Sequence, residues 1–268
     1  MTVEATQEEL EAGRGYEALF VPALFAPWPK HLLRAIGIKK GSHVVDIACG
    51  TGVLARAALL QSGPSGRVVG LDAAPGMIAA AMEVEPGIEW VLGQAENLPF
   101  EDGAFDCVVS QFGMMFFKDR PKAAGEMFRV TKPGGRLSLA IWHSIDRNPA
   151  YKDIVAVLEE HVSAAAAQAV TIPFSLGDPE QVVQSLSEAG YRNIAVEHQS
   201  EQARFPTTRT MVEVELRGWL PLFDIHLGED HIADVLKKSD AGLSKYASPS
   251  GEAIFGTSAY IVTAEKLD

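Results

Sequence analysis

The feature that most constrains the fold is an alternation of short apolar segments with helical patterns over residues 42–142. Strands of a parallel sheet are buried on both faces, so they read as nearly continuous apolar runs. Such runs occupy residues 44–48, 68–71, 88–92, 105–110 and 137–142. The alternation predicts an α/β fold whose mostly parallel sheet is covered by helices on both faces.

Glycine and proline mark the ends of the expected helices. These helices are expected at residues 53–61, from Pro75 onward, and at 121–130, 149–161 and 179–189. The last of them is capped by Asp178 and closed by Gly190. β-Branched and aromatic content predicts two further strands, at 194–198 and 253–264.

A glycine-rich turn follows the first strand. Gly50 and Gly52 lead into a helix, and the Gly-x-Gly-x-x-Ala pattern matches the dinucleotide-binding fingerprint, in which glycines let a ligand approach the backbone. Asp72 ends the second strand, where its carboxylate can accept both hydrogen bonds of a ribose diol. Together these residues predict a nucleoside ligand.

The negative charge of Asp46, beside the turn, helps to distinguish between possible nucleoside ligands. A pyrophosphate needs a site without anions, whereas the ammonium and sulfonium of S-adenosylmethionine (AdoMet) are cations that favour a nearby carboxylate. Asp46 therefore favours AdoMet over NAD as the cofactor. The alternative is that Asp46 and Asp72 only cap turns.

The sequence resembles the class I AdoMet-dependent methyltransferases, and within them the group similar to ubiquinone and menaquinone biosynthesis methyltransferases. The matching segments are 44–52, 69–72, 75–77, 95–100, 105–106, 128–130 and 132–137. The resemblance implies a Rossmann-like, seven-stranded, mostly parallel sheet with an antiparallel last strand. It also implies helices on both faces of the sheet and helical insertions over the active site.

The resemblance further implies a set of cofactor-binding residues. Asp72 would hold the ribose, Gly50 and Gly52 would face the methionine part, and the Ala95 backbone would meet adenine. The family often has Asp where this chain has Gln94, whose amide can still bond the adenine amino group. The complete predicted set is Tyr16, Asp46, Ala48, Gly50, Gly52, Asp72, Ala73, Met77, Gln94, Ala95, Glu96, Gln111 and Phe112.

We interpret residues 1–268 as a single methyltransferase domain. Residues 1–35 would form an N-terminal helical lid, for whose aromatic residues core packing is the alternative. Residues 36–145 would form the cofactor-binding core. Residues 146–190 and 206–250 would be helical insertions on the substrate side. The lid aromatics are Tyr16, Phe20, Phe25 and Trp28.

Two apolar segments are candidates for the acceptor pocket. Residues 114–117, a Met-Met-Phe-Phe run, follow the fourth strand, and residues 219–223 contain Trp219 and Phe223. A core patch is the alternative for the first segment, and a core helix or a homodimer face for the second. The pockets would suit a small hydrophobic or aromatic metabolite, methylated on oxygen or carbon.

His143 is the predicted catalytic base. It directly follows the fifth strand, at the sheet edge where ligands of open α/β folds bind, and histidine titrates near neutral pH. It could take the proton of a phenolic acceptor as the methyl group arrives. The alternatives are that it caps the turn before Asp146, or that positioning alone suffices.

Composition argues against several other classes. The net charge of −12 disfavours a nucleic-acid partner. The longest stretch without formal charge, 162–177, is too polar to span a membrane. The acidic start at 1–11 is unlike a signal peptide. We therefore expect a cytoplasmic protein. His226 and His231 lie on different sides of a helix, so we expect no metal site.

AdoMet-dependent methyl transfer to a small molecule is therefore the predicted function. Three alternatives stay open. An enzyme with the same fold and nucleoside could perform a different step, such as a decarboxylation or an isomerisation. The chain could bind AdoMet without transferring its methyl group, or it could be a NAD-binding oxidoreductase on a similar fold.

Overall fold

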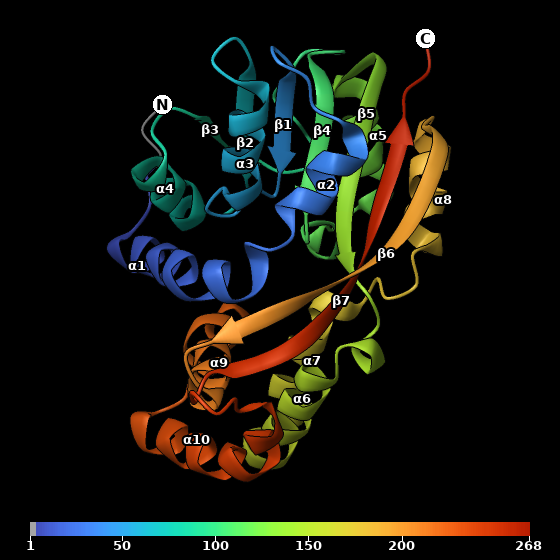
Figure 1. The fold of residues 1–268 in the computed structure, drawn as a ribbon. Coiled ribbons are helices and arrows are strands. Elements are labelled where there is room, and N and C mark those ends of the chain that lie inside the picture. The colour runs from blue at the N-terminus through green and yellow to red at the C-terminus, as the bar shows by residue number, and fades with distance from the viewer. Residues whose placement is uncertain (1–3) are drawn as a thin grey trace.

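The computed structural model describes residues 4–268, and in them seven strands form one sheet with the order β3-β2-β1-β4-β5-β7-β6 (Figure 1). Residues 1–3, the first part of the predicted N-terminal segment, lie outside the described residues. The strands are β1 His43–Ile47, β2 Arg67–Asp72, β3 Glu89–Leu92, β4 Phe105–Gln111, β5 Thr131–Trp142, β6 Arg192–Phe205 and β7 Ala253–Glu265. Strands β1 to β5 pair in parallel, and β7 is antiparallel to both β5 and β6. The predicted mostly parallel sheet with an antiparallel last strand is confirmed.

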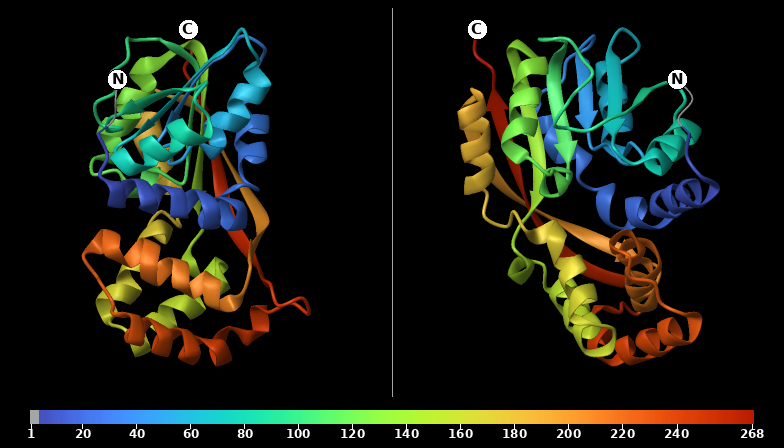
Figure 2. Two further views of the ribbon diagram at one scale, coloured as in Figure 1. Left: turned by 90° about the vertical axis from the view of Figure 1, so that its left-hand side faces the viewer. Right: turned by 180° about the vertical axis from the view of Figure 1, so that it is seen from behind.

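Helices cover both faces of this sheet. The α-helices are α1 Gln7–Gly15, α2 Pro29–Ile36, α3 Val53–Ser62, α4 Pro75–Val84, α5 Arg120–Val130, α6 Pro149–His161, α7 Ala164–Thr171, α8 Glu180–Ala189, α9 Thr208–Val214 and α10 Glu229–Leu243. Helices α2 and α3 lie on one face, and α5 and α8 lie on the other (Figure 2). The central strand β1 is buried by this double cover, which explains its continuous apolar run.

Several shorter helical segments lie near the carboxyl ends of the strands. The π-helical segments are η1 Tyr16–Phe25 and η5 Glu215–Trp219, and the 3-10 segments are η2 Met114–Phe116, η3 Ile145–Arg147, η4 Ile172–Phe174, η6 Leu220–Phe223 and η7 Ser244–Tyr246. The segment η5 spans a single π turn, a feature that often occurs at functional sites. The two π segments lie close together, since a Cβ on Gly218 of η5 would lie 3.5 Å from the Phe20 ring of η1.

Strand β5 begins earlier than the predicted residue 137. Thr131 already pairs with Phe105, and the ladder resumes with Arg136 opposite Cys107 after a register shift. Between them Gly134 has a φ of 71°, which lets the Pro-Gly segment bulge out without ending the strand. The Pro-Gly segment is therefore an irregularity within the strand.

Strands β6 and β7 form a long antiparallel ribbon that runs on beyond the sheet into a group of helices, α6, α7, α9 and α10 (Figures 1 and 2). The prediction for β6 covered only 194–198. The rest of β6 was missed because it is a largely exposed edge strand whose polar side chains give no apolar pattern. The ribbon connects the sheet with the helical part of the molecule.

The N-terminal helices cross below the carboxyl ends of the central strands (Figure 1). Helix α1 packs closely on α4, since a Cβ on Gly13 would lie 2.4 Å from the carbonyl oxygen of Gly76. Segment η1 follows without a break and contains Pro22. This arrangement places the aromatic residues of η1 over the end of the sheet.

Candidate functional site

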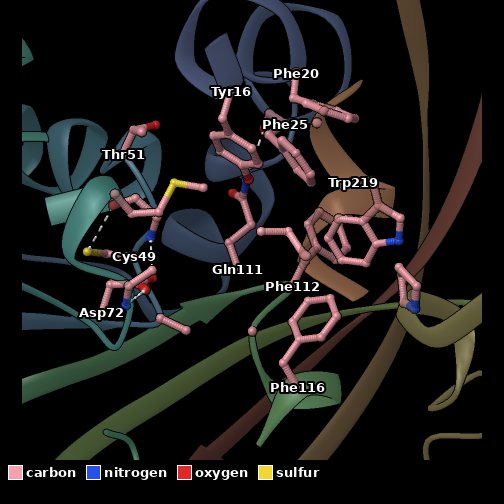
Figure 3. A pocket seen from close by; sticks show the side chains of 18 of the residues that line it. Tyr16, Phe20, Phe25, Cys49, Thr51, Asp72, Gln111, Phe112, Phe116 and Trp219 are labelled. Carbon is pink, nitrogen blue, oxygen red and sulfur yellow. Dashed lines mark hydrogen bonds between the residues drawn. The ribbon is translucent and has the colours of Figure 1, made fainter. Parts of the chain in front are cut away.

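A cavity of about 1030 Å³ lies between the carboxyl ends of β1, β2, β4 and β5 and the helical segments η1, α6, η4 and η5 (Figure 3). Open α/β sheets bind ligands at this edge. One end of the cavity is formed by the glycine-rich turn and the end of β2. The other end is walled by aromatic side chains from both parts of the molecule.

Twelve of the thirteen predicted cofactor-binding residues line this one cavity. They are Tyr16, Asp46, Ala48, Gly50, Asp72, Ala73, Met77, Gln94, Ala95, Glu96, Gln111 and Phe112. The structure therefore brings these residues together from η1 and from four strand ends. What each of them binds stays a prediction.

Gly52 is the residue of the predicted set that does not line the cavity. It has a φ of 90°, and a Cβ at this position would lie 2.2 Å from the indole ring of Trp90. Gly52 is therefore required by backbone conformation and by packing against Trp90, and its expected contact with the cofactor stays a prediction that the cavity lining does not support. Gly50, with a φ of 56°, does face the cavity, where the Tyr16 ring covers it.

The carboxylate of Asp72 holds the turn that it faces. Its Oδ2 accepts a hydrogen bond from the Gly50 N–H at 2.8 Å, and its Oδ1 accepts one from the Ala74 N–H at 2.9 Å. Each oxygen has a second lone pair, so a carboxylate bonded in this way can still accept from ribose hydroxyls. Asp72 therefore caps the turn, as the alternative stated, and this contact still leaves its carboxylate able to bind a ribose.

Asp46 is buried, with an exposed fraction of 1%, and neither of its carboxylate oxygens has a hydrogen-bonding partner among residues 4–268. Burial raises its pKa well above the usual range; the backbone N–H of Ala55 opposes the rise, the nearby Asp72 adds to it, and the charge of Arg56 opposes it. A buried, unpaired carboxylate is costly unless a donor or a cation reaches it. The cation expected at this place is the ammonium group of AdoMet, so the residues present fit that ligand.

Two strand ends at the cavity have backbone conformations that non-glycine residues seldom adopt. Ala48 after β1 and Phe112 after β4 have φ values of 56° and 57°. A Cβ on Gly113 would lie 2.5 Å from the Ala48 Cβ, so the two turns pack directly together. Such strained residues cluster at binding sites, and both of these line the cavity.

Side chains from β4 connect the sheet to η1. The Gln111 Nε2 donates to the Phe25 carbonyl oxygen at 3.1 Å, while its Oε1 is buried with no partner among residues 4–268. The Phe112 ring stacks on the Trp142 indole, with the centroids 3.7 Å apart and the planes 4° from parallel. These contacts fix the wall between the cofactor end and the aromatic end (Figure 3).

The aromatic and apolar residues of these candidate segments are divided between the cavity and the core. Tyr16, Phe20 and Phe25 of η1 line the cavity, whereas Trp28 is fully buried in the core. In the run at 114–117, Met114 and Met115 are core residues and Phe116 and Phe117 line the cavity. In the segment at 219–223, Trp219 and Leu222 line it, while Leu220 is buried in the core.

His143 does not line the cavity. Its ring stacks on Tyr260, with its Nε2 hydrogen-bonded to the Tyr260 hydroxyl at 2.8 Å, and its Nδ1 accepts from the Ser144 N–H at 2.6 Å. Burial and the neighbouring His198 lower its pKa. Both ring nitrogens are thus engaged by β7 and by the turn after β5. This arrangement favours the turn-capping alternative, and the role as a base stays a prediction.

Two buried ionisable residues at the acceptor end of the cavity were missed by the sequence analysis. Glu215 on η5 and Tyr151 on α6 are 3% and 7% exposed, and both line it. A signal was present, because Glu215 stands between Met211, Val212 and Trp219 at helical spacing, on the apolar face of its helix. A carboxylate on such a face is buried only at a cost, which marks it for a function.

Other expectations concern the rest of the chain. Among residues 4–268, no group of three or more His, Cys, Asp or Glu side chains could hold a metal ion. Cys49 and Cys107 are buried free thiols. Within the same residues, no helix combines the length and the apolar character needed to cross a membrane.

Comparisons with known proteins add to this geometry. A protein family described as "Methyltransferase domain" matches residues 45–139. The ubiquinone/menaquinone biosynthesis C-methyltransferase UbiE of Pasteurella multocida is 39% identical over 116 residues, which cover 41% of this chain and 43% of that protein. A demethylmenaquinone methyltransferase of Staphylococcus aureus is 30% identical over 183 residues, 63% of this chain and 76% of that protein. The matched segment spans less than half the length of the Pasteurella relative.

A solved structure agrees over nearly the whole chain. Phospholethanolamine N-methyltransferase 2 of Haemonchus contortus, in complex with phosphomonomethylethanolamine and S-adenosylhomocysteine, superposes with a TM-score of 0.62. The likeness covers 98% of this chain and 58% of that one. At 20% identity it shows a shared fold.

Proposed function

The chain belongs to the class I AdoMet-dependent methyltransferases, in the group related to ubiquinone and menaquinone biosynthesis methyltransferases, and we propose that it methylates a small hydrophobic or aromatic molecule. The cofactor of this family is AdoMet, which supplies an electrophilic methyl group on a sulfonium. The proposal concerns the acceptor, the transfer and the residues that carry them.

The observation that carries the proposal is the buried, unpaired carboxylate of Asp46 in the same cavity as Asp72. A dinucleotide would bring the negative charge of a pyrophosphate to this end of the cavity, which Asp46 would repel. A cationic amino acid portion would instead give Asp46 the partner that it lacks. Asp46 therefore supports AdoMet against the alternative of NAD.

In this proposal the protein works by position and by exclusion of water. Asp46 binds an ammonium group, Asp72 binds the ribose, and Gln94, Ala95 and Glu96 lie around the adenine. Residues 4–35 cover the cavity as a lid, with the Tyr16 ring over the glycine-rich turn. A displacement at a methyl carbon needs alignment and a dry site more than it needs acid or base groups.

Part of the acceptor end is built from segments that follow the matched family domain. Tyr151, Phe174 and Trp219 line the cavity and all follow residue 139. Their largely apolar surface favours an aromatic or otherwise hydrophobic acceptor. The names of the relatives, which refer to quinones, support an aromatic ring methylated on carbon or oxygen. A cytoplasmic location also belongs to the proposal, supported by the two buried free thiols.

Calorimetry tests the cofactor part. The protein should bind AdoMet more tightly than NAD, and Asp72→Ala should weaken AdoMet binding by at least about tenfold, because charge-assisted hydrogen bonds are lost. Asp230→Ala, on the exposed face of α10, is the matched control and should bind AdoMet like the parent. Tighter binding of NAD by the parent protein would overturn the proposal.

Transfer is tested separately, with AdoMet labelled by tritium in the methyl group and a set of phenols, hydroquinones and other small metabolites. An active methyltransferase passes the label to at least one hydrophobic acceptor. A protein that binds AdoMet and labels nothing across the set would be the silent binding module instead.

A further inference from the structure

Glu215 places a buried carboxyl group at the acceptor end of the cavity. None of the roles proposed above for the transfer involves this carboxyl group. It is the first residue of the π-helical segment η5, and Trp219 of the same segment also lines the cavity. Its neighbours Val214 and Leu216 are buried apolar residues. The carboxyl group is therefore held in an apolar wall rather than at the surface.

Among the described residues, no cationic side chain faces the Glu215 carboxyl group. The hydroxyl of Tyr151, from α6, lies beside the carboxyl group, and Tyr16 of η1 lies near Tyr151. Arg217, two residues along η5, is occupied at the rim by Glu213 and Glu229, each 2.7 Å away. The acidic residues Asp46 and Asp72 line the opposite, cofactor end of the cavity.

We propose that Glu215 binds a hydroxyl group of the methyl acceptor and takes its proton, with Tyr151 as the residue that positions the carboxylate. This inference rests on the proposed methyl transfer and names the group that prepares the acceptor. The O–H bond of the acceptor breaks, its electron pair stays on the oxygen, and the proton bonds to a Glu215 carboxylate oxygen. The resulting anion is the stronger nucleophile toward the sulfonium methyl carbon, whose bond to sulfur breaks with the electron pair left on sulfur. The proton leaves Glu215 for water when the product departs.

The raised pKa of the Glu215 carboxyl group suits its role as a base. Burial raises the pKa of Glu215 to about 8, while the neighbouring Tyr151 hydroxyl opposes the rise. An ordinary carboxylate is a weak base toward a phenol, whose pKa is about 10. A carboxylate with a raised pKa is a better match, because proton transfer is most effective when the base titrates near the working pH.

The first experiment measures binding to the protein loaded with S-adenosylhomocysteine, so that no transfer occurs. The probes are 2-naphthol and 2-methoxynaphthalene, which has a similar ring system but no O–H to donate. The parent should prefer 2-naphthol by about tenfold or more, and Glu215→Leu should lose this preference. Glu188→Gln, an exposed carboxyl on α8, is the control and should keep it.

The second measurement is the pH dependence of 2-naphthol binding. Glu215 ionises as the pH rises through about 8, and the carboxylate then accepts a stronger, charge-assisted hydrogen bond. Affinity in the parent should therefore rise by about fivefold across that range and stay flat in Glu215→Gln. Tyr151→Phe, which removes the hydroxyl beside the carboxylate, should shift the midpoint upward.

Three results would overturn the inference: no binding of 2-naphthol, equal binding of the two probes by the parent, or an unchanged pH dependence in Glu215→Gln. A preference for the cation 2-naphthylmethylammonium that is lost in Glu215→Leu, with none for 2-naphthol, would overturn the hydroxyl assignment. Binding of S-adenosylhomocysteine is scored independently. Its failure would count against the proposed function, whereas its success without a 2-naphthol preference would count against Glu215 alone.

Discussion

The Thr51 hydroxyl donates a hydrogen bond to the Glu17 carboxylate at 2.5 Å and so joins the glycine-rich turn to η1. Arg56 of α3 donates to the other oxygen of Glu17 at 2.8 Å and to the Thr51 carbonyl oxygen at 2.6 Å. The three residues are partly buried or buried. They form the polar connection that holds the N-terminal segment over the cofactor end of the cavity.

Glu17→Ala should loosen this segment. The change leaves the Thr51 hydroxyl and the Arg56 guanidinium without their acceptor, at a cost of about 1 to 2 kcal/mol in a partly exposed site. Protease cleavage within η1 should become about five- to thirtyfold faster, and AdoMet should dissociate faster. Limited proteolysis and stopped-flow binding measure the two effects. Glu8→Ala, an exposed carboxyl on α1, should change neither, and unchanged cleavage in Glu17→Ala would show that the connection does not hold the segment.

Asp46→Asn should have opposite effects on stability and on binding. The pKa of Asp46 is raised in the folded protein, so its ionisation reduces stability as the pH rises above the ordinary value of 3.8. The neutral amide avoids that loss, and the melting temperature of the ligand-free variant at pH 7 should exceed that of the parent. Binding of AdoMet should weaken by about tenfold or more, because the charge that attracts its ammonium is gone. Thermal unfolding with and without AdoMet checks both signs, and a variant with lower stability and intact affinity would contradict this account of Asp46.

Gly52→Ala should destabilise the fold with little direct effect on the cavity surface. The new Cβ would meet the Trp90 ring, and alanine is strained at a φ of 90°. The expected cost is about 1 to 3 kcal/mol. Gly228→Ala, at the start of α10 with open space around it, is the matched control and should cost much less. Denaturant unfolding measures the free energy of unfolding of both variants. Combining Gly52→Ala with Trp90→Leu should recover part of the lost stability.

The sheet and the cofactor end could be predicted because their residues follow local rules. Val44 and Val45 belong to a strand buried on both faces, and Gly50, Asp46 and Asp72 stand at strand ends that a parallel sheet brings to one edge. Local rules also leave the role of Gly52 open. A glycine in such a turn signals a close approach, but the sequence does not say whether a ligand or the Trp90 ring makes it.

The acceptor end depends on contacts between segments far apart in the chain. Glu215 and Tyr151 meet only because the β6–β7 ribbon brings η5 to α6. The exposed part of β6 has no apolar period, so the length of that ribbon cannot be read from the sequence. The surroundings of His143 could not be predicted for a related reason: its position after β5 follows from the sequence, but the direction of its ring depends on Tyr260 of β7.

His143→Gln should leave methyl transfer within about threefold of the parent rate, because the ring does not face the cavity.

The effect of His143→Gln should fall on the stability of the fold instead. The pKa of His143 is lowered in the folded protein from the ordinary value of 6.5, so the neutral ring contributes stability that is present above pH 6.5 and is lost as the pH falls below it. Protonation would also place an N–H of the ring against the Ser144 N–H, which now donates to Nδ1. Loss of the hydrogen bond to Tyr260 costs about 0.5 to 1.5 kcal/mol at pH 8, and the difference between parent and variant should shrink between pH 7 and pH 5. Denaturant unfolding across that range measures it, with His226→Gln at an exposed site as the control. A loss of transfer rate of about a hundredfold in His143→Gln, with AdoMet affinity intact, would instead restore the role of His143 as the base.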